Sequence, residues 1–429
     1  MKISEGNIPS NRVHAVTLSR RARRSLLLAL ESLALILLNH SARAQGWSTV
    51  DDFPYLEQGA YNAGLTLAPN GNLFGAGFGD YSLGYRGLVR ASADGGNTWS
   101  LLDDFLYPGL NYTVFAGMVS DSAGNLYVAG TAYDDGSADG GPFHWIVRRS
   151  TDGGATWSIV DDFVPGGQFT QPNGITVDAA GNVYVTGDAD YNTGNNYWTV
   201  RKGVGGVNFT TVDSVRGYGF YNTAWAVFVH PTAGIFAAGE APVVVNKFGG
   251  TALEWTVRRS TNGGAAWATV DTFVLPATGS SIYRAEARGI GADALGNLYV
   301  VGRAAAQYKG SGYFHWVVRK GVNGGASWTT DDNYAPNLQG TQKAMGFAAN
   351  PKTGDLYVGG GTGPNWWAGD TEWIIRKKAV GSSTWINDDD FKFGSYSGAQ
   401  AITANGSGNI FVGGSGSAGT SSHWLVRKK

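Results

Sequence analysis

One phrase recurs along this chain of 429 residues and limits its possible folds more than any other feature. It consists of an aromatic strand ending in Val-Arg, a glycine-rich turn, a tryptophan and an acidic strand, and its clearest copy is residues 144–163. A second element, Asp-x-x-Gly-Asn followed by an apolar run and glycine, lies between successive phrases, for example at 121–130 and 178–187. The residue that closes the phrase recurs every 52 to 61 residues, at Trp47, Trp99, Trp157, Phe209, Trp267, Trp328 and Trp385. Such a repeat predicts a fold built from equivalent units.

Each period contains about four short runs of alternating β-branched and aromatic residues, separated by Gly, Asn and Asp turns. No part of the repeat shows a helical period over ten residues. Four strands per period, repeated seven times, predict an all-β, seven-bladed β-propeller of four-stranded antiparallel blades.

The two ends of the repeat complement each other. Residues 424–429 end after the third strand of a blade, whereas 47–53 resemble a fourth strand that lacks its blade. We therefore predict that the N-terminal strand pairs with the C-terminal blade and closes the ring. The predicted propeller occupies residues 45–429, with blades at about 54–106, 107–164, 165–215, 216–273, 274–334, 335–391, and 392–429 plus 47–53.

The turn before the repeated tryptophan resembles the Asp-box (BNR) motif, Ser-x-Asp-x-Gly-x-Thr-Trp, of sialidases and many other propellers. Residues 92–99 and 150–157 match it fully, and residues 260–267 and 321–328 match it with substitutions. We interpret the motif as structural, because the acid and hydroxyls can satisfy the hairpin backbone while the indole inserts between sheets. The residues assigned to this role are Asp94, Trp99, Asp152, Trp157, Asn262, Trp267, Asn323 and Trp328.

The Asp-x-x-Gly-Asn element is similar to the repeat of bacterial seven-bladed β-propeller proteins of the SBBP type. Together the two resemblances cover residues 47–429 and imply the fold of the sialidase-like propeller superfamily. They imply no single activity, because Asp-boxes occur in enzymes, receptors and assembly factors. The acidic doublets, such as Asp103-Asp104 and Asp161-Asp162, also recur with the blades, and we interpret them as structural or edge-protecting charges on outer strands.

Residues 1–44 are predicted to be a secretory signal peptide. An arginine cluster at 20–24 precedes an apolar run at 26–38, and small residues at 42 and 44 fit a cleavage site near Ala44. The apolar run is shorter than the ~20 residues that a membrane span requires. We therefore expect a secreted, periplasmic or cell-surface protein without membrane insertion.

Composition excludes several classes of function. Removal of the leader leaves 25 Lys and Arg against 31 Asp and Glu, a net charge of −6, and no basic segment remains, so we expect no nucleic-acid partner. The chain has no cysteine, which excludes thiolate catalysis and Cys-based zinc sites. The histidines of the repeat fall in different blades, too far apart for one metal ion. We expect a monomer with no metal and no cofactor.

Function is expected on the face with variable loops, which connect second to third strands and one blade to the next. At the entry to each innermost strand a variable residue precedes a small one. These variable residues should surround the mouth of the central channel: Ala63, Ala116, Asn173, Trp225, Arg288, Met345 and Gln400. Trp225 and Arg288 would suit a stacked ring or a carboxylated ligand, although Trp225 could instead plug the channel.

Adjacent tryptophans in the polar loop 361–372 form a second aromatic candidate, with packing onto a neighbouring blade as the alternative. The predicted ligand-binding residues are Trp225, Arg288, Asn173, Gln400, Trp366, Trp367 and Tyr221.

We predict an exported, non-catalytic binding propeller whose partner is a glycan or an extracellular protein. The alternative is a glycoside hydrolase, sialidase-like or similar to xyloglucan hydrolases, acting at the loop face. It would use Glu286 with Tyr283, Arg284 and Arg288, the one segment that combines a carboxylate, a tyrosine and arginines. The chain lacks the early Arg-Ile-Pro motif of sialidases. A structural envelope protein is the third possibility.

Overall fold

The computed structural model describes residues 46–57, 59–134, 142–167, 169–191, 193–216, 221–244, 251–275, 284–305, 313–336, 340–363 and 372–429. Contacts divide the chain into residues 1–45 and 46–429, and the predicted signal peptide lies outside the described residues. In the described ranges the regular elements are strands and one short 3-10 turn, η1 (Tyr55–Glu57), so the all-β prediction is confirmed. No described helix has the length and apolar character needed to cross a membrane.

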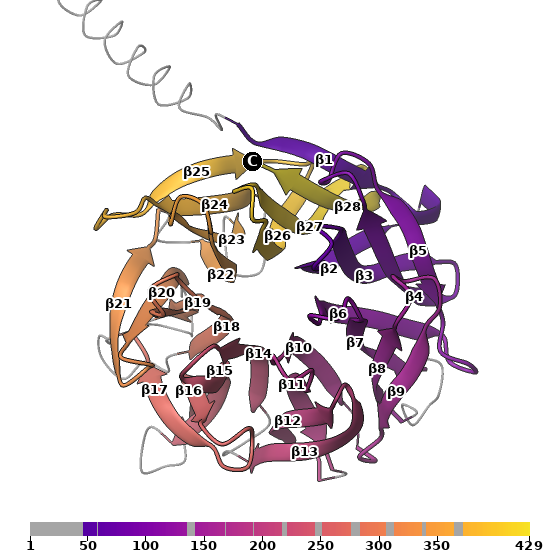
Figure 1. The fold of residues 1–429 in the computed structure, drawn as a ribbon, viewed down its shortest axis with the longest axis horizontal. Helices are drawn as coiled ribbons and strands as arrows, with labels where there is room; N and C mark the ends of the chain where they lie inside the picture. Colours follow the sequence, from indigo (N-terminus) through magenta and orange to yellow (C-terminus); the bar gives the residue numbers. More distant parts are fainter. Residues whose placement is uncertain are drawn as a thin grey trace, which may run out of the picture. The chain divides into compact units, whose positions relative to one another are not determined.

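The strands of residues 46–429 fall into four classes by their distance from the centre of Figure 1. The innermost are β2 (Ala60–Leu67), β6 (Tyr112–Ser120), β10 (Gln171–Val177), β14 (Thr223–His230), β18 (Arg284–Ala292), β22 (Thr341–Ala349) and β26 (Tyr396–Ala404). The second are β3 (Leu73–Tyr81), β7 (Leu126–Tyr133), β11 (Val183–Asp190), β15 (Gly234–Val244), β19 (Leu298–Ala305), β23 (Leu356–Gly363) and β27 (Ile410–Ala418).

The third and outer strands complete the units. The third are β4 (Gly84–Ser92), β8 (His144–Ser150), β12 (Asn196–Val204), β16 (Thr251–Ser260), β20 (His315–Val322), β24 (Glu372–Lys378) and β28 (Ser421–Lys428). The outer are β5 (Ser100–Phe105), β9 (Ser158–Phe163), β13 (Val207–Arg216), β17 (Ala268–Phe273), β21 (Ser327–Tyr334), β25 (Ile386–Phe391) and β1 (Ser48–Phe53).

Four consecutive strands form an antiparallel unit, which confirms the predicted four-stranded antiparallel sheets. Three sheets consist of one unit each, β10–β13, β22–β25 and β26–β28 with β1. Two eight-stranded sheets each contain two units, joined where Tyr85 pairs with Tyr112 and where Leu253 pairs with Arg284. The innermost strand of each unit contacts that of the next, and β26 contacts β2.

Strand β1 does not belong to the unit that follows it in sequence. It pairs antiparallel with β28, from Ser48 opposite Lys428 to Phe53 opposite Trp424. In the described part of the chain, a segment near residue 50 therefore supplies the outer strand of the unit formed by β26, β27 and β28 (Figure 1).

The core between units consists of tryptophans packed against glycines. The third-strand tryptophans are at most 1% exposed, as predicted for core residues: Trp145, Trp198, Trp255, Trp316, Trp373 and Trp424. A methyl group on Gly187 of β11 would lie 2.7 Å from the Trp145 ring, and one on Gly302 of β19 would lie 2.8 Å from the Trp255 ring. Only glycine therefore allows the indole of one unit to approach the second strand of the next this closely, and each buried indole removes roughly 150–250 Å² from water.

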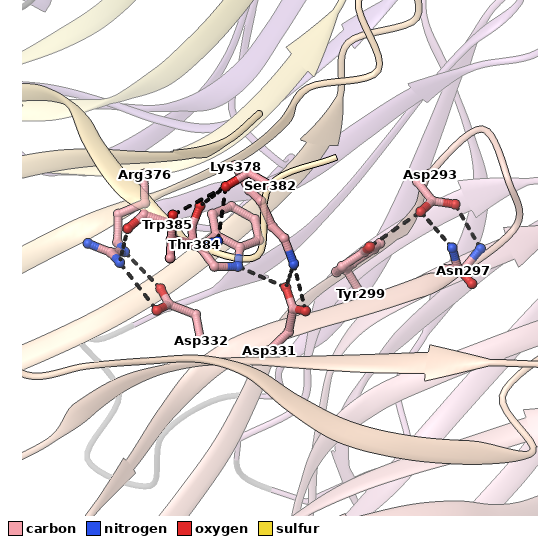
Figure 2. A network of polar contacts seen from close by, with 10 residues as sticks. All are labelled: Asp293, Asn297, Tyr299, Asp331, Asp332, Arg376, Lys378, Ser382, Thr384 and Trp385. Carbon is pink, nitrogen blue, oxygen red and sulfur yellow. Dashed lines mark hydrogen bonds and ion pairs between the residues drawn. The ribbon is translucent and has the colours of Figure 1, made fainter. Parts of the chain in front are cut away.

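A recurring buried ion pair links each outer strand to the third strand of the following unit. Figure 2 shows one example, in which Asp332 of β21 binds Arg376 of β24, with Oδ2 2.8 Å from Nε. The other pairs are Asp51–Arg90, Asp103–Arg148, Asp161–Arg201, Asp213–Arg258, Asp271–Arg319 and Asp389–Arg427. For these aspartates the structural alternative is correct and the edge-protecting one is wrong, because the next unit covers the outer strand and buries the carboxylate.

The Asp-box turns satisfy their own backbone. The Asp94 carboxylate accepts hydrogen bonds from Thr98 Oγ1 at 2.7 Å and from the Thr98 amide at 2.9 Å. Asn262 Oδ1 similarly accepts from the Ala266 amide at 2.8 Å, and the Trp99 indole donates to the Gly96 carbonyl at 3.2 Å. Asn323 instead occupies the left-handed backbone region, with φ of 53°.

At two copies of the repeated tryptophan, Trp385 and Trp47, the indole binds the neighbouring unit instead. Trp385 Nε1 donates to Asp331 Oδ2 at 2.8 Å, beside the Lys378 ammonium (Figure 2). Trp47 Nε1 donates in the same way to Asp388 at 2.7 Å. The indole N–H at this repeat position is thus hydrogen-bonded in these copies as well, although its acceptor belongs to the adjacent unit.

Candidate functional site

A β-bulge occurs at the same place in every innermost strand. In β10, for instance, Pro172 pairs with Gly187 and Gly174 with Thr186, so Asn173 has no partner across the ladder. The bulged positions are the variable residues singled out in the sequence: Ala63, Ala116, Asn173, Trp225, Arg288, Met345 and Gln400. Because a bulge redirects its side chain, the repeat presents a different residue at one equivalent position in each unit.

A central cavity of about 200 Å³ is lined by these innermost strands. Six of the seven bulged residues line it. Gln400 is not among the lining residues, although its neighbours Ala401 and Ile402 are. The side of this cavity lined by Ala63 and Ala116 has small side chains. The other side has the larger side chains of Trp225, Arg288 and Met345.

A larger cavity of about 710 Å³ lies beside the central one and shares Trp225 and Arg288 with it. Strands β10, β11, β14, β15 and β18 line it, together with the segments that precede β8, β10, β12 and β14. These segments connect second to third strands or one unit to the next, so they belong to the variable class. The aromatic lining residues are Phe143, Phe169, Tyr221 and Trp225, and the charged and amide ones are Gln171, Asp188, Asp190, Asn196, Glu240, Arg284 and Arg288.

Trp225 and Arg288 lie together in the wall between the two cavities. The Arg288 guanidinium carbon is 3.6 Å from the centre of the Trp225 ring, a close cation–π contact. Trp225 Nε1 donates to Glu240 Oε1 at 3.4 Å. Since Arg288 covers a face of the indole, the guanidinium and the ring form one composite surface.

Glu286 is the anchor of an arginine cluster. Its carboxylate is fully buried and binds Arg284 Nε at 2.6 Å, Arg303 Nη2 at 2.7 Å and Arg288 Nε at 2.8 Å. Burial by itself raises the pKa of Glu286, but the charges of Arg288, Arg303 and Arg284 outweigh burial and hold the pKa below its usual range. Glu286 therefore stays ionised at neutral pH and would be poorly suited to donating a proton in the hydrolase alternative. Tyr283 lies outside the described residues.

For two other carboxyl groups in the cavity wall, the surroundings raise the pKa instead of lowering it. Burial raises the pKa of Asp188 to about 7, although Gln171 and Asn173 donate hydrogen bonds to it. Burial, and then the charge of Glu286, raise the pKa of Glu240 well above its ordinary value. Glu240 is 1% exposed, and its Oε2 makes no hydrogen bond, with Arg284 Nε 3.8 Å away. Both groups can exchange protons near neutral pH.

Asp188 and Glu240 were missed in the sequence, although a signal for them exists. Each directly follows the glycine that ends the Asp-x-x-Gly-Asn element, after Gly187 and Gly239, and Arg303 follows Gly302 in the next copy. The same position holds Phe78, Thr131, Gly361 and Ser415 in the other copies. Three consecutive copies of the repeat therefore have a charged residue at this position, and this pattern is visible in the sequence.

The remaining predicted ligand residues have mixed placements. Asn173 is half-buried and donates to Asp188 Oδ1 at 3.2 Å and to the Ala224 carbonyl at 3.3 Å. Tyr221 is 60% exposed at the rim of the larger cavity. Trp366 and Trp367 lie outside the described residues.

The opposite face contains a hollow of about 650 Å³, lined by three Asp-x-x-Gly-Asn turns. Its charged lining residue, Asp121, already accepts hydrogen bonds from the Ala123 and Asn125 amides of its own turn at 2.9 Å. Within the described ranges, no three His, Cys, Asp or Glu side chains group closely enough to hold a metal ion. The 710 Å³ cavity is therefore the candidate site.

Comparison with known proteins agrees with this architecture. Residues 166–192 match the family model of the SBBP β-propeller repeat. No curated protein matches the sequence. An α-L-arabinofuranosidase from Fusarium graminearum, solved with an iminosugar inhibitor, is 12% identical with a TM-score of 0.52, and the match covers 89% of this chain and 97% of that one.

Two further structures have the same fold. A polysaccharide lyase of family PL25, an ulvan lyase bound to a glucuronate–sulfated rhamnose disaccharide, is 12% identical with a TM-score of 0.53 over 88% of this chain and 95% of that one. A protein of unknown function from Dyadobacter fermentans is 14% identical with a TM-score of 0.50 over 89% and 98%. At these identities the likeness concerns the fold alone. The expected resemblance is thus confirmed: the chain carries a β-propeller repeat and is similar to propeller proteins over nearly its whole length.

Proposed function

We propose that this protein is a closed, seven-bladed β-propeller that binds a carbohydrate in the 710 Å³ cavity. The contact of β26 with β2 and the pairing of β1 with β28 support closure. The buried ion pairs support it as well, because Asp51–Arg90 and Asp389–Arg427 link the unit that contains β1 to both of its neighbours. The proposed blades keep the boundaries predicted from the sequence.

The composition of the cavity wall carries the carbohydrate proposal. Aromatic side chains, here Phe169, Tyr221 and Trp225, offer apolar surfaces that suit the C–H faces of a sugar ring. Carboxyl and amide groups such as Asp188 and Asn196 suit hydroxyl groups, which both donate and accept hydrogen bonds. An enclosed site that combines aromatic walls with a few convergent polar groups is the usual form of a small-molecule pocket.

The comparisons support the same class of ligand. The arabinofuranosidase and the ulvan lyase both act on glycans, and both share the propeller fold at low identity. An extracellular protein remains the other partner that the sequence suggested. In the proposal the protein is exported and cleaved near Ala44, which would bring the cavity into contact with extracellular or envelope polysaccharides.

The test is a glycan array probed with the purified protein and with two variants. Trp225→Ala removes the aromatic wall and the support of Arg288, so we expect retention of the bound sugar class to fall by about tenfold or more. Leu295→Ala, at a side chain 88% exposed in the β18–β19 turn, serves as the control and should bind like the wild type. A blank array, or equal retention by Trp225→Ala, would refute the proposed site.

A glycoside hydrolase is the second candidate, and one observation favours it. Asp188 and Glu240 line one cavity, and the raised pKa of Glu240 suits a proton donor, while Asp188, with a pKa of about 7, is partly ionised at neutral pH and could act as the base. In that case Glu240 would protonate the glycosidic oxygen and Asp188 would activate water, in place of the predicted Glu286. Release of reducing ends from a glycan retained on the array, abolished by Glu240→Gln, would support it.

A further inference from the structure

The wall of the 710 Å³ cavity contains more acidic than basic groups. Among its described lining residues, Asp188, Asp190 and Glu240 carry carboxyl groups, whereas Arg284 and Arg288 carry guanidinium groups. Both arginines also bind Glu286, which lies behind the wall and shares a third arginine, Arg303. With this second layer the described cluster holds four carboxyls and three guanidiniums, so when all the carboxyls are ionised, one negative charge is left over in either count.

The surplus lies on the β11 side of the cavity. Asp188 is 2% exposed and accepts hydrogen bonds only from neutral amides among the described residues, those of Gln171, Asn173 and Asn196. Asp190 is 5% exposed, and its Oδ1 accepts from the Thr193 amide at 2.9 Å. In the described ranges neither aspartate forms an ion pair, although a buried carboxylate is normally accompanied by a cation.

Glu240 adds an independent observation on the opposite wall. Glu240 lines the cavity, and its Oε2 atom makes no hydrogen bond, although the side chain is almost entirely buried. Leaving a buried acceptor unpaired is unfavourable, so such an atom indicates a donor that the protein itself does not supply. Arg284 Nε, at 3.8 Å, is beyond hydrogen-bond distance and lies closer to Glu286.

The missing donor should be a monocation, because one positive charge balances the cluster. Since no three acidic or histidine side chains of the described residues group as metal ligands, an ammonium group fits better than a metal ion. Aromatic faces such as those of Phe169 and Tyr221 also favour an ammonium group. We propose that the cavity binds an amino sugar with a free, protonated amino group, held by Glu240 and the carboxyls of β11. This inference rests on the proposed carbohydrate site and specifies its ligand.

Proton linkage offers a readout that does not depend on affinity alone. Asp188, with a pKa raised by burial to about 7, is partly protonated at neutral pH. A bound ammonium favours the ionised carboxylates, so binding should release protons to the buffer. A neutral sugar in the same cavity would release few or none.

The test is isothermal titration calorimetry with the purified protein at a pH of about 5.5, where the sugar amine is mostly charged and Asp188 still carries a proton that binding can release. The probes are fully deacetylated chito-oligosaccharides and the same oligomers fully N-acetylated. We expect the deacetylated oligomer to bind about 10- to 100-fold more tightly, the range for hydrogen bonds to charged groups. Its heat should vary with the ionisation enthalpy of the buffer, as proton release requires.

Variants assign the effect to the carboxyls. Glu240→Gln and Asp188→Asn should each weaken binding of the deacetylated oligomer by about tenfold and binding of the acetylated oligomer much less, because an amide can still form hydrogen bonds with hydroxyl groups. Glu254→Gln, a half-buried glutamate outside this cavity, is the matched control and should bind like the wild type. Melting curves check that each variant is folded.

Equal affinity for the two oligomers, or normal binding by folded Glu240→Gln and Asp188→Asn, would overturn the ammonium site. If the glycan array shows retention of neutral or acidic sugars only, the carbohydrate proposal stands and this inference fails. If no glycan is retained and a lysine-rich peptide binds instead, both fail.

Discussion

The buried ion pair between Asp271 of β17 and Arg319 of β20 allows a quantitative test of how neighbouring units are held together. Asp271 Oδ1 accepts from Arg319 Nη2 at 2.6 Å and Oδ2 accepts from Nε at 2.9 Å, and both side chains are at most 10% exposed. The guanidinium carbon also lies 4.6 Å from the centre of the Phe273 ring. Replacing Asp271 by leucine would leave this guanidinium buried without its counter-charge, which should cost about 3–5 kcal/mol of unfolding free energy.

The same geometry predicts that replacing Arg319 as well as Asp271 restores part of the lost stability. Burial raises the pKa of Asp271 even though Arg319 opposes the shift, so burying the carboxylate costs more than the pairing returns. Replacing both residues, Asp271→Leu with Arg319→Met, should therefore recover at least about half of the loss, because an apolar pair needs no counter-charge. Lys392→Ala, which removes an exposed pair with Glu372, should cost less than about 1 kcal/mol.

Urea unfolding followed by circular dichroism measures these differences, provided that the slopes of the variants agree. A loss below about 1 kcal/mol for Asp271→Leu would contradict the burial argument. A double variant no more stable than the single one would contradict the desolvation argument, since the ion pair would then be strongly favourable in itself.

Two further predictions concern pH and the first strand. The pKa of Asp188 is raised to about 7 in the folded protein, so its contribution to stability is fully present below its unfolded value near 4 and is lost as pH rises through about 7. The unfolding free energy of the wild type should thus fall, relative to that of Asp188→Asn, by up to about 4 kcal/mol between pH 4 and pH 8. If the difference in unfolding free energy between the two proteins stayed constant with pH, the raised pKa of the buried carboxyl would be contradicted. Deletion of residues 46–53 should lower the melting temperature strongly, because it removes the strand that pairs with β28 and leaves Arg90 without Asp51. An unchanged melting temperature would exclude the unit shared between β1 and β26–β28. Ser48→Ala, at an exposed side chain, is the control.

The site could be predicted only in part. Trp225, Arg288 and Asn173 stood out because subtraction of the repeat left them as the variable residues of innermost strands, and the structure places all three at the bulges. Glu240 and Asp188 did not stand out, because a charged residue after a glycine in a strand usually faces solvent. Their importance depends on the neighbouring units, which bury them and determine their pKa values.

The contacts between arginines and carboxylates could not be predicted from the sequence either. The Val-Arg ending and the acidic outer strand were both visible in every period, yet their pairing joins residues about 40 positions apart in adjacent units. Glu286 was considered as a candidate catalytic residue because its tyrosine and arginine neighbours in sequence resembled a catalytic group. In the folded protein three guanidiniums surround it, and two of them come from its own strand while Arg303 comes from β19.

The repeating unit could be predicted without the structure, because its strand periodicity, its glycine turns and the spacing of its tryptophans are local properties of the sequence. That was enough to predict an all-β fold of four-stranded antiparallel sheets, with a tryptophan core between them. Tertiary structure alone decided which side chains meet across units, because contacts between adjacent sheets depend on twist, bulge position and burial rather than on sequence spacing. The cavity, with its surplus carboxyls and the Glu240 oxygen that makes no hydrogen bond, is lined by residues from four adjacent units.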